Sequence, residues 1–143
     1  ILCGGAAEPY YEPAAPSVIY FREDFYRSAL HEVAHWCVAG PVRRGLPDYG
    51  YWYVPDGRNA EQQSAFCSVE VKPQAIEALF CEALDLTFAV SVDNLTVDAN
   101  CPEITHFKAA VDRQIMRFRQ QGLPDRALRF KKALTLLAVE RSG

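Results

Sequence analysis

Residues 24–39 read DFYRSALHEVAHWCVA, and this stretch decides the fold. Its apolar side chains recur at the three- and four-residue spacing of one helix face; they are Phe25, Ala29, Leu30, Val33, Ala34 and Cys37. Gly40 and Pro41 follow directly and supply a stop, because glycine favours a helix end and proline cannot continue one. The pattern predicts a central helix over residues 24–39.

Shorter apolar segments on both sides of this helix predict strands. Val18 to Phe21 precedes it, and residues 49–54 read YGYWYV, an aromatic run that the turn residues Pro55-Asp56-Gly57 close. A third strand is expected over Phe88 to Val92. Residues 1–16 are rich in Ala, Pro, Glu and Tyr without a period, so we expect an extended arm there.

The rest of the chain predicts helices. One begins near Asn59, a good capping residue, and runs to about Val71, where Pro73 either kinks it or begins a new helix. Two more are expected over Pro102 to Gln121 and Pro124 to Val139. Strands and helices that do not alternate regularly indicate α+β architecture, with several helices packed on a small sheet in one domain over residues 1–143.

The composition narrows the class of protein. A chain of 143 residues, half of them hydrophobic and 23% charged, has enough apolar surface to fold around a core. It contains no apolar run of the roughly 18 residues that a membrane span needs and no signal-peptide pattern, so we expect a cytoplasmic protein. Ile1 in place of Met indicates an earlier native start. Five scattered cysteines without a Cys-x-x-Cys pair argue against disulfides or a thiolate zinc site.

Charge is distributed unevenly along the chain. Residues 1–101 hold 6 basic and 14 acidic residues, a net charge of −8, whereas residues 102–143 hold 9 and 4, a net charge of +5. On the helix from Pro102, the expected buried stripe is Ile104, Phe107, Val111, Ile115 and Phe118, which leaves Lys108, Arg113 and Arg117 outward. The basic residues either form ordinary solvated faces or guide an acidic partner.

The central helix carries the motif His31-Glu32-Val33-Ala34-His35, which matches His-Glu-x-x-His. Residues four apart lie on one helix face, so both imidazoles can reach a single ion. Two imidazole nitrogens favour zinc, iron, nickel or copper over magnesium or calcium. The motif predicts a transition-metal site; two ordinary packed histidines are the alternative.

A catalytic metal usually has three protein ligands, so a third is expected from another element. Glu70 lies between two valines, where an ionised carboxylate is unfavourable unless a cation compensates its charge. Glu77, two helical turns further on, is the alternative, and His106 is a weaker one because it lies on a basic helix. Glu70 is the preferred third ligand.

Two histidines and one carboxylate serve two different chemistries. With zinc and Glu32 as general base, the set describes a metallopeptidase, for which Tyr51 to Val54 offers a strand edge to an extended substrate. With ferrous iron and open coordination positions, it describes a non-haem oxygenase. The motif alone leaves both open.

Four blocks of the sequence together resemble a known family, the elongation factor P hydroxylases, over most of the chain. The blocks are HEVAHWC at residues 31–37, DYGYWYVPDGR at 48–58, VEVKPQA at 69–75 and DNL at 93–95. The first is weakly specific, whereas the four in this order are specific. The family has further residues before the start of this chain, which is the main departure.

This resemblance implies a non-haem Fe(II) monooxygenase that uses O2 to hydroxylate the modified, β-lysylated lysine of elongation factor P, a translation factor that relieves ribosomes stalled on proline runs. The family's metal set falls on His31, His35 and Glu70. Glu32 then orients a ligand or moves protons. The family's α+β fold is similar to that of metal-dependent endoribonucleases, so a zinc-dependent hydrolase, metallopeptidase-like or endoribonuclease-like, remains the alternative. A non-catalytic, metal-stabilised binding module is a third hypothesis.

The implied substrate is a long, positively charged side chain, which carboxylates and flat aromatic walls would bind. The candidate substrate-binding residues of this kind are Asp48, Tyr49, Tyr51, Trp52, Tyr53 and Asp56. They have an ordinary alternative as core aromatics and turn aspartates. Arg58 is a further candidate for substrate binding, and Lys72 is a candidate catalytic residue. They flank the site and either bind a carboxylate or the oxygen species at the metal, or form surface salt bridges. We expect elongation factor P as an acidic partner, and neither a membrane nor a nucleic acid.

Overall fold

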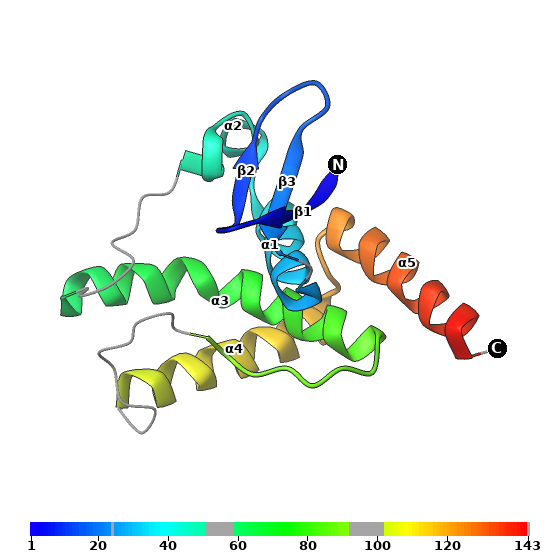
Figure 1. Cartoon of the computed structure of the whole chain (residues 1–143). Helices are drawn as coiled ribbons and strands as arrows, with labels where there is room; N and C mark the ends of the chain where they lie inside the picture. Colours follow the sequence, from blue (N-terminus) through cyan, green and yellow to red (C-terminus); the bar gives the residue numbers. More distant parts are fainter. Residues whose placement is uncertain (24, 51–58, 92–101, 143) are drawn as a thin grey trace. The chain divides into compact units, whose positions relative to one another are not determined.

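The computed structural model describes residues 1–23, 25–50, 59–91 and 102–142 of the chain. The chain divides into two compact units, residues 1–51 and residues 52–143. The first unit contains a small sheet and a long helix, and the second contains three long helices (Figure 1). The α+β prediction is therefore confirmed, whereas the assignment of residues 1–143 to a single domain stays a prediction.

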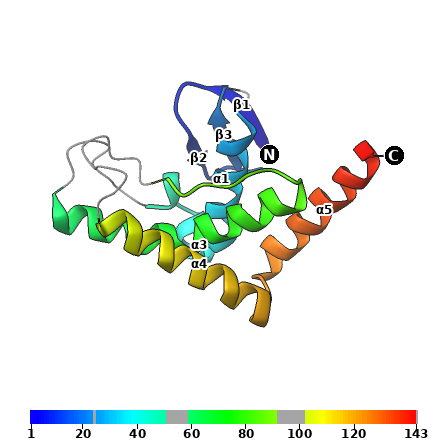
Figure 2. The ribbon, with the colours of Figure 1, turned by 90° about the horizontal axis from the view of Figure 1, so that it is seen from below.

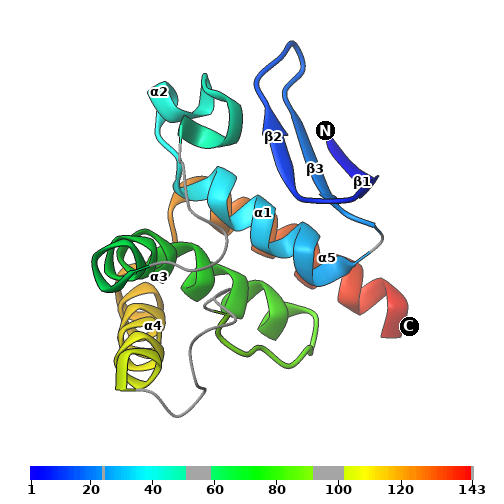
Figure 3. The same ribbon diagram turned by 60° about the vertical axis from the view of Figure 1, so that its left-hand side comes forward.

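The sheet of the first unit has three strands in the order β1-β3-β2 (Figure 3). β1 (Leu2–Ala6) runs parallel to β3 (Val18–Arg22), and β2 (Tyr10–Glu12) runs antiparallel to it. The prediction of an extended arm over residues 1–16 is thus wrong. Most side chains of β1 are exposed, so this segment has no hydrophobic alternation and becomes a strand through backbone pairing with β3.

Helix α1 (Tyr26–Val38) follows β3 and packs against it. Five of the six apolar side chains predicted for its inner face are buried, namely Ala29, Leu30, Val33, Ala34 and Cys37. Phe25 is exposed because it precedes the first helical turn. The Ser28 hydroxyl accepts a hydrogen bond from the Arg22 N–H at 3.0 Å, which ties the end of β3 to the start of α1. The predicted central helix is confirmed.

Two short helices follow α1, namely α2 (Pro41–Arg44) and the 3-10 helix η1 (Pro47–Gly50). η1 packs against β2. The strand predicted over residues 49–54 is wrong for Tyr49 and Gly50, which belong to η1, and its other residues lie outside the described chain. Asp48 and Tyr49 have positive φ angles of 46° and 59°, so they turn the chain where a strand would extend it.

The second unit consists of α3 (Ala60–Ala83), α4 (Pro102–Gln121) and α5 (Asp125–Ser142), and both later helices contact α3 (Figure 2). Asn59 and Gln62 form a capping box, with side-chain to backbone distances of 2.8 and 3.0 Å. α3 continues through Pro73, so no new helix begins there. None of the described helices combines the length and the apolar character that crossing a membrane requires.

The core of the second unit lies between α3 and α4. Ala75, Phe107 and Val111 form its centre, and the surrounding apolar side chains include Val71, Ile115, Phe118, Phe88 and Val90. Residues 88–91 are not a strand, which corrects the prediction for Phe88 to Val92 as far as Ser91; Val92 lies outside the described residues. The Gln74 amide instead donates to Ser91 O at 2.5 Å and accepts from Ser91 N at 3.0 Å. One side chain thus supplies the hydrogen bonds that a neighbouring strand would provide.

Candidate metal centre

His31 and His35 lie one helical turn apart on α1, and their side chains meet. The two Nε2 atoms are 3.1 Å apart, and the ring planes form an angle of 75°. Two nitrogens that each bind one ion at about 2.0–2.1 Å are separated by about 2.8–3.4 Å, for angles between octahedral and tetrahedral. The observed separation therefore suits two ligands of one metal ion.

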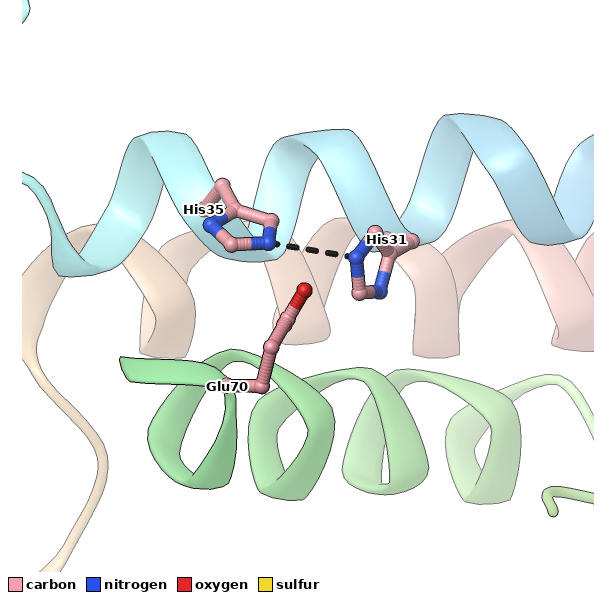
Figure 4. Close-up of side chains that lie close together, drawn as sticks. All are labelled: His31, His35 and Glu70. Atoms are coloured by element: carbon pink, nitrogen blue, oxygen red, sulfur yellow. Dashed lines mark hydrogen bonds between the residues drawn. The ribbon is translucent and has the colours of Figure 1, made fainter. Parts of the chain in front are cut away.

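Glu70 of α3 completes the group. One ligand atom from each of His31, His35 and Glu70 lies within 4.8 Å of the other two (Figure 4). Glu70 is 5% exposed. Glu77 is also buried, at 9% exposure, and His106 is exposed, but neither belongs to the group. Within the described part of the chain, this is the one cluster of three or more such residues.

The chemistry of these side chains fits a divalent transition metal. Two imidazoles and one carboxylate form a mixed nitrogen and oxygen set that both zinc and non-haem ferrous iron accept. A carboxylate as buried as that of Glu70 is unfavourable in its ionised form unless positive charge compensates it. An ion at this place would compensate it.

Glu32, the acidic residue of the motif, is half-buried on α1. Burial raises the pKa of the Tyr49 hydroxyl well above its ordinary value, and the negative charge of Glu32 raises it further. The Glu32 carboxylate therefore acts electrostatically on Tyr49, and the Tyr49 phenol stays neutral at ordinary pH.

Tyr49 lies between a second tyrosine and a histidine of the metal motif. Its ring stacks on Tyr11 with 4.3 Å between centroids and 12° between planes. The His35 ring is nearly parallel to it, at 16° and 6.3 Å. Tyr49 is 4% exposed, so an incoming cation has little access to its ring face.

The backbone of Asp48 and Tyr49 is held by several hydrogen bonds. The left-handed conformation is unfavourable by about 1–2 kcal/mol for a residue such as Tyr49, and by less for Asp48, because aspartate tolerates it better. The Asp48 carboxylate accepts from Tyr11 N at 2.8 Å, and the Arg43 guanidinium donates to Tyr49 O at 3.0 Å. Tyr11 also donates its own hydroxyl to Arg44 O at 2.6 Å. These contacts stabilise the turn and bring Tyr49 beside His35.

Comparison with known proteins identifies the family of this chain. Residues 1–139 match the family model described as elongation factor P hydroxylase, EpmC. The chain belongs to this family. It is also similar to the elongation factor P lysine hydroxylase of Haemophilus influenzae, with 48% identity over 137 residues, which cover 93% of this chain and 76% of that protein. The resemblance drawn from the four sequence blocks is confirmed.

The structure brings together only some of the residues that sequence reasoning proposed for this member of the hydroxylase family. Lys72 is exposed on α3, and residues two apart on a helix do not share a face, so it points away from the side of Glu70. Asp48 hydrogen bonds to the backbone of β2. The remaining predicted substrate-binding residues lie outside the described chain; they are Tyr51, Trp52, Tyr53, Asp56 and Arg58.

Sequence reasoning missed two residues that shape these surroundings. Tyr11 belongs to a segment without any period, so no local signal marks it as buried. Gln74 lies within the VEVKPQA block of the hydroxylase family, and its place in this block is the one feature of the sequence that could have identified it. Its contact with Ser91 joins residues 17 apart in the chain, which no local pattern predicts.

Proposed function

We propose that this chain is a non-haem iron hydroxylase that adds one oxygen atom to the modified lysine of elongation factor P. The observation that carries the proposal is the match of residues 1–139 to the hydroxylase family, together with a relative named for lysine hydroxylation of this factor. The grouping of His31, His35 and Glu70 supports it, because the group offers the ligand types that ferrous iron accepts. The proposal includes a cytoplasmic location, where elongation factor P takes part in translation.

His31, His35 and Glu70 would hold the ion and leave other coordination positions open. Ferrous iron bound by such a set supplies the activation of dioxygen. For the overall reaction to balance, one oxygen atom becomes the hydroxyl group on carbon. The other leaves as water, with two electrons from an external reductant and two protons from solvent.

The chain's own residues would bind the substrate and manage protons. Glu32 follows His31 directly in the sequence and is half-buried, and its carboxylate would orient a ligand or accept and return a proton. The acidic and aromatic side chains among residues 51–56 would bind the ammonium groups of the β-lysylated side chain; they are Tyr51, Trp52, Tyr53 and Asp56. Arg58 is proposed to contact an anionic group near the substrate.

Intact-mass analysis tests the proposed function directly. Elongation factor P that carries the β-lysyl group is incubated with this protein, ferrous iron, oxygen and ascorbate as reductant. We expect the mass to rise by one oxygen atom, and the rise to be absent without iron or with the His31→Ala variant. An unchanged mass with the iron-loaded wild type would contradict the proposal.

Metal analysis of anaerobically purified protein provides a second, independent test. We expect iron to be retained and oxygen to be consumed when the modified factor is added. Retention of zinc, without oxygen uptake and with cleavage of a peptide or RNA, would support the hydrolase alternative.

A further inference from the structure

The stacked tyrosines Tyr11 and Tyr49 differ in what their hydroxyl groups contact. The Tyr11 hydroxyl donates to Arg44 O at 2.6 Å. The Tyr49 hydroxyl is buried, and among the described residues nothing hydrogen bonds to it. Buried polar groups are nearly always hydrogen-bonded, so a hydroxyl left in this state calls for an explanation.

Packing does not require this hydroxyl. A phenylalanine would keep the ring stacked on Tyr11 and parallel to the ring of His35, and it would remove the unfavourable burial of a polar atom. The backbone nevertheless holds Tyr49 in a defined place. Asp48 and Tyr49 both have left-handed backbone conformations, and hydrogen bonds stabilise them. Such conformations concentrate where a side chain must be aimed.

We infer that the Tyr49 hydroxyl is a hydrogen-bond donor kept for a ligand that binds beside His35 at the metal centre. The inference rests on the proposed function, because it takes the ion held by His31, His35 and Glu70 as the place where the ligand binds. Tyr49 is a positioning residue in this role. A phenol hydroxyl has a proton to donate, and the stacking of the ring on Tyr11 fixes the position of the hydroxyl oxygen.

The role assigned to Tyr49 differs from the one expected from the sequence. An exposed aromatic wall would attract the charged lysine through its ring face, but Tyr11 covers one face of the Tyr49 ring. The hydroxyl at the ring edge is therefore the group through which Tyr49 would contact a ligand. Its partner is a small hydrogen-bond acceptor, which the anion azide can represent in an experiment.

Tyr49→Phe and Tyr11→Phe form a matched pair that tests the inference. Each variant keeps its ring and loses one hydroxyl. We expect Tyr11→Phe to lower the Tm by roughly 2–6 °C because Arg44 O loses a donor, and Tyr49→Phe to leave the Tm unchanged or slightly higher. A large fall in Tm for Tyr49→Phe alone would show a purely structural role and overturn the inference.

The ligand itself is probed with azide on the cobalt(II)-loaded protein, whose visible absorption reports binding without any turnover. Tyr49→Phe should bind azide about 10-fold to 100-fold more weakly than wild type, whereas Tyr11→Phe should bind it normally. Equal affinity in all three proteins, or no azide binding by wild type, overturns the inference. Weaker azide binding by Tyr49→Phe together with a wild type that adds no oxygen to elongation factor P would sustain the inference and refute the proposed function.

Discussion

The Nε2 atoms of His31 and His35 are close enough to share one hydrogen bond, in which one ring donates and the other accepts. A metal ion at this site would take the place of the shared proton, because both nitrogens would then present lone pairs to it. The helical spacing alone brings the two nitrogens together, so the pair needs no rearrangement to bind an ion. Only the carboxylate ligand has to come from elsewhere in the chain.

Single substitutions of the three grouped residues should abolish metal retention. His31→Ala, His35→Ala and Glu70→Ala each remove one ligand, so metal affinity should fall by at least about 100-fold while the far-ultraviolet circular dichroism stays near wild type. Metal content after anaerobic purification measures the effect. Glu77→Gln is the matched control, because Glu77 is also buried on α3 and lies outside the group. Retention by Glu70→Ala with loss in Glu77→Gln would make Glu77 the third ligand.

Glu32→Gln separates a hydroxylase from a hydrolase. A hydrolase needs this carboxylate as the base for a metal-bound water, whereas a hydroxylase uses it only to orient groups or pass protons. We expect metal binding to persist and hydroxylation to slow by as much as about 100-fold, measured by mass spectrometry under multiple turnover. Wild-type cleavage of peptide or RNA that disappears in Glu32→Gln would refute the hydroxylase.

Among the elements, α3 is 24 residues long and carries three features that matter for the fold and the site. Asn59 caps its first turn, Glu70 offers a carboxylate, and Gln74 binds the backbone of Ser91. Pro73 lies between the last two and removes one helical hydrogen bond, a loss of about 3 kcal/mol in an exposed helix. The buried packing of the turn at residues 73–76 offsets this loss, so the helix continues.

Gln74→Leu should destabilise the second unit. The change keeps the volume of the side chain and leaves the Ser91 N–H and C=O without their partner, so the free energy of unfolding should fall by about 1–3 kcal/mol. Urea denaturation measures it. Glu82→Gln, which weakens the exposed ion pair with Arg119, should change stability by less than about 1 kcal/mol. Similar losses of unfolding free energy in Gln74→Leu and Glu82→Gln would show that the contact between Gln74 and Ser91 does not stabilise this segment.

Across the whole molecule, positive charge gathers in the last third of the sequence. Lys108, Arg113 and Arg117 are exposed on α4, as predicted, and the stripe that includes Phe107 and Val111 is buried or half-buried. These basic side chains are therefore open to solvent. An acidic protein substrate would be attracted to them, and salt would weaken the attraction beyond about 8–10 Å.

Reversal of Arg113 and Arg117 to Glu should raise the apparent Michaelis constant for intact elongation factor P by about 3-fold to 10-fold, with little change in turnover at saturation. The difference from wild type should shrink as salt is raised. A short peptide that carries the same modified lysine is the control, because it lacks an acidic surface. An equal loss toward protein and peptide would mean that these arginines support the fold or the site, and the docking hypothesis would fail.

Local physics explains which parts of this protein were predictable. The bounds of α4 and the buried face of α1 follow from apolar residues at helical spacing, and the meeting of His31 with His35 follows from the same period. Strands were less predictable. β1 and β2 exist through pairing with β3. Residues 88–91 were predicted as a strand, but they pair with none of the described strands, and Ser91 hydrogen bonds to the Gln74 side chain.

The sequence by itself determined the long helices α1, α4 and α5, the two histidine ligand candidates and the family, because each depends on residues close together in the chain or on fixed blocks. Only the tertiary structure decided which carboxylate lies with the histidines. Glu70 and Glu77 lie two turns apart on α3 and are nearly equally buried, so helical period and burial cannot separate them. The stack of Tyr11 on Tyr49 likewise joins residues 38 positions apart through a turn with two left-handed residues. Contacts of this kind depend on how distant segments meet, which no local pattern encodes.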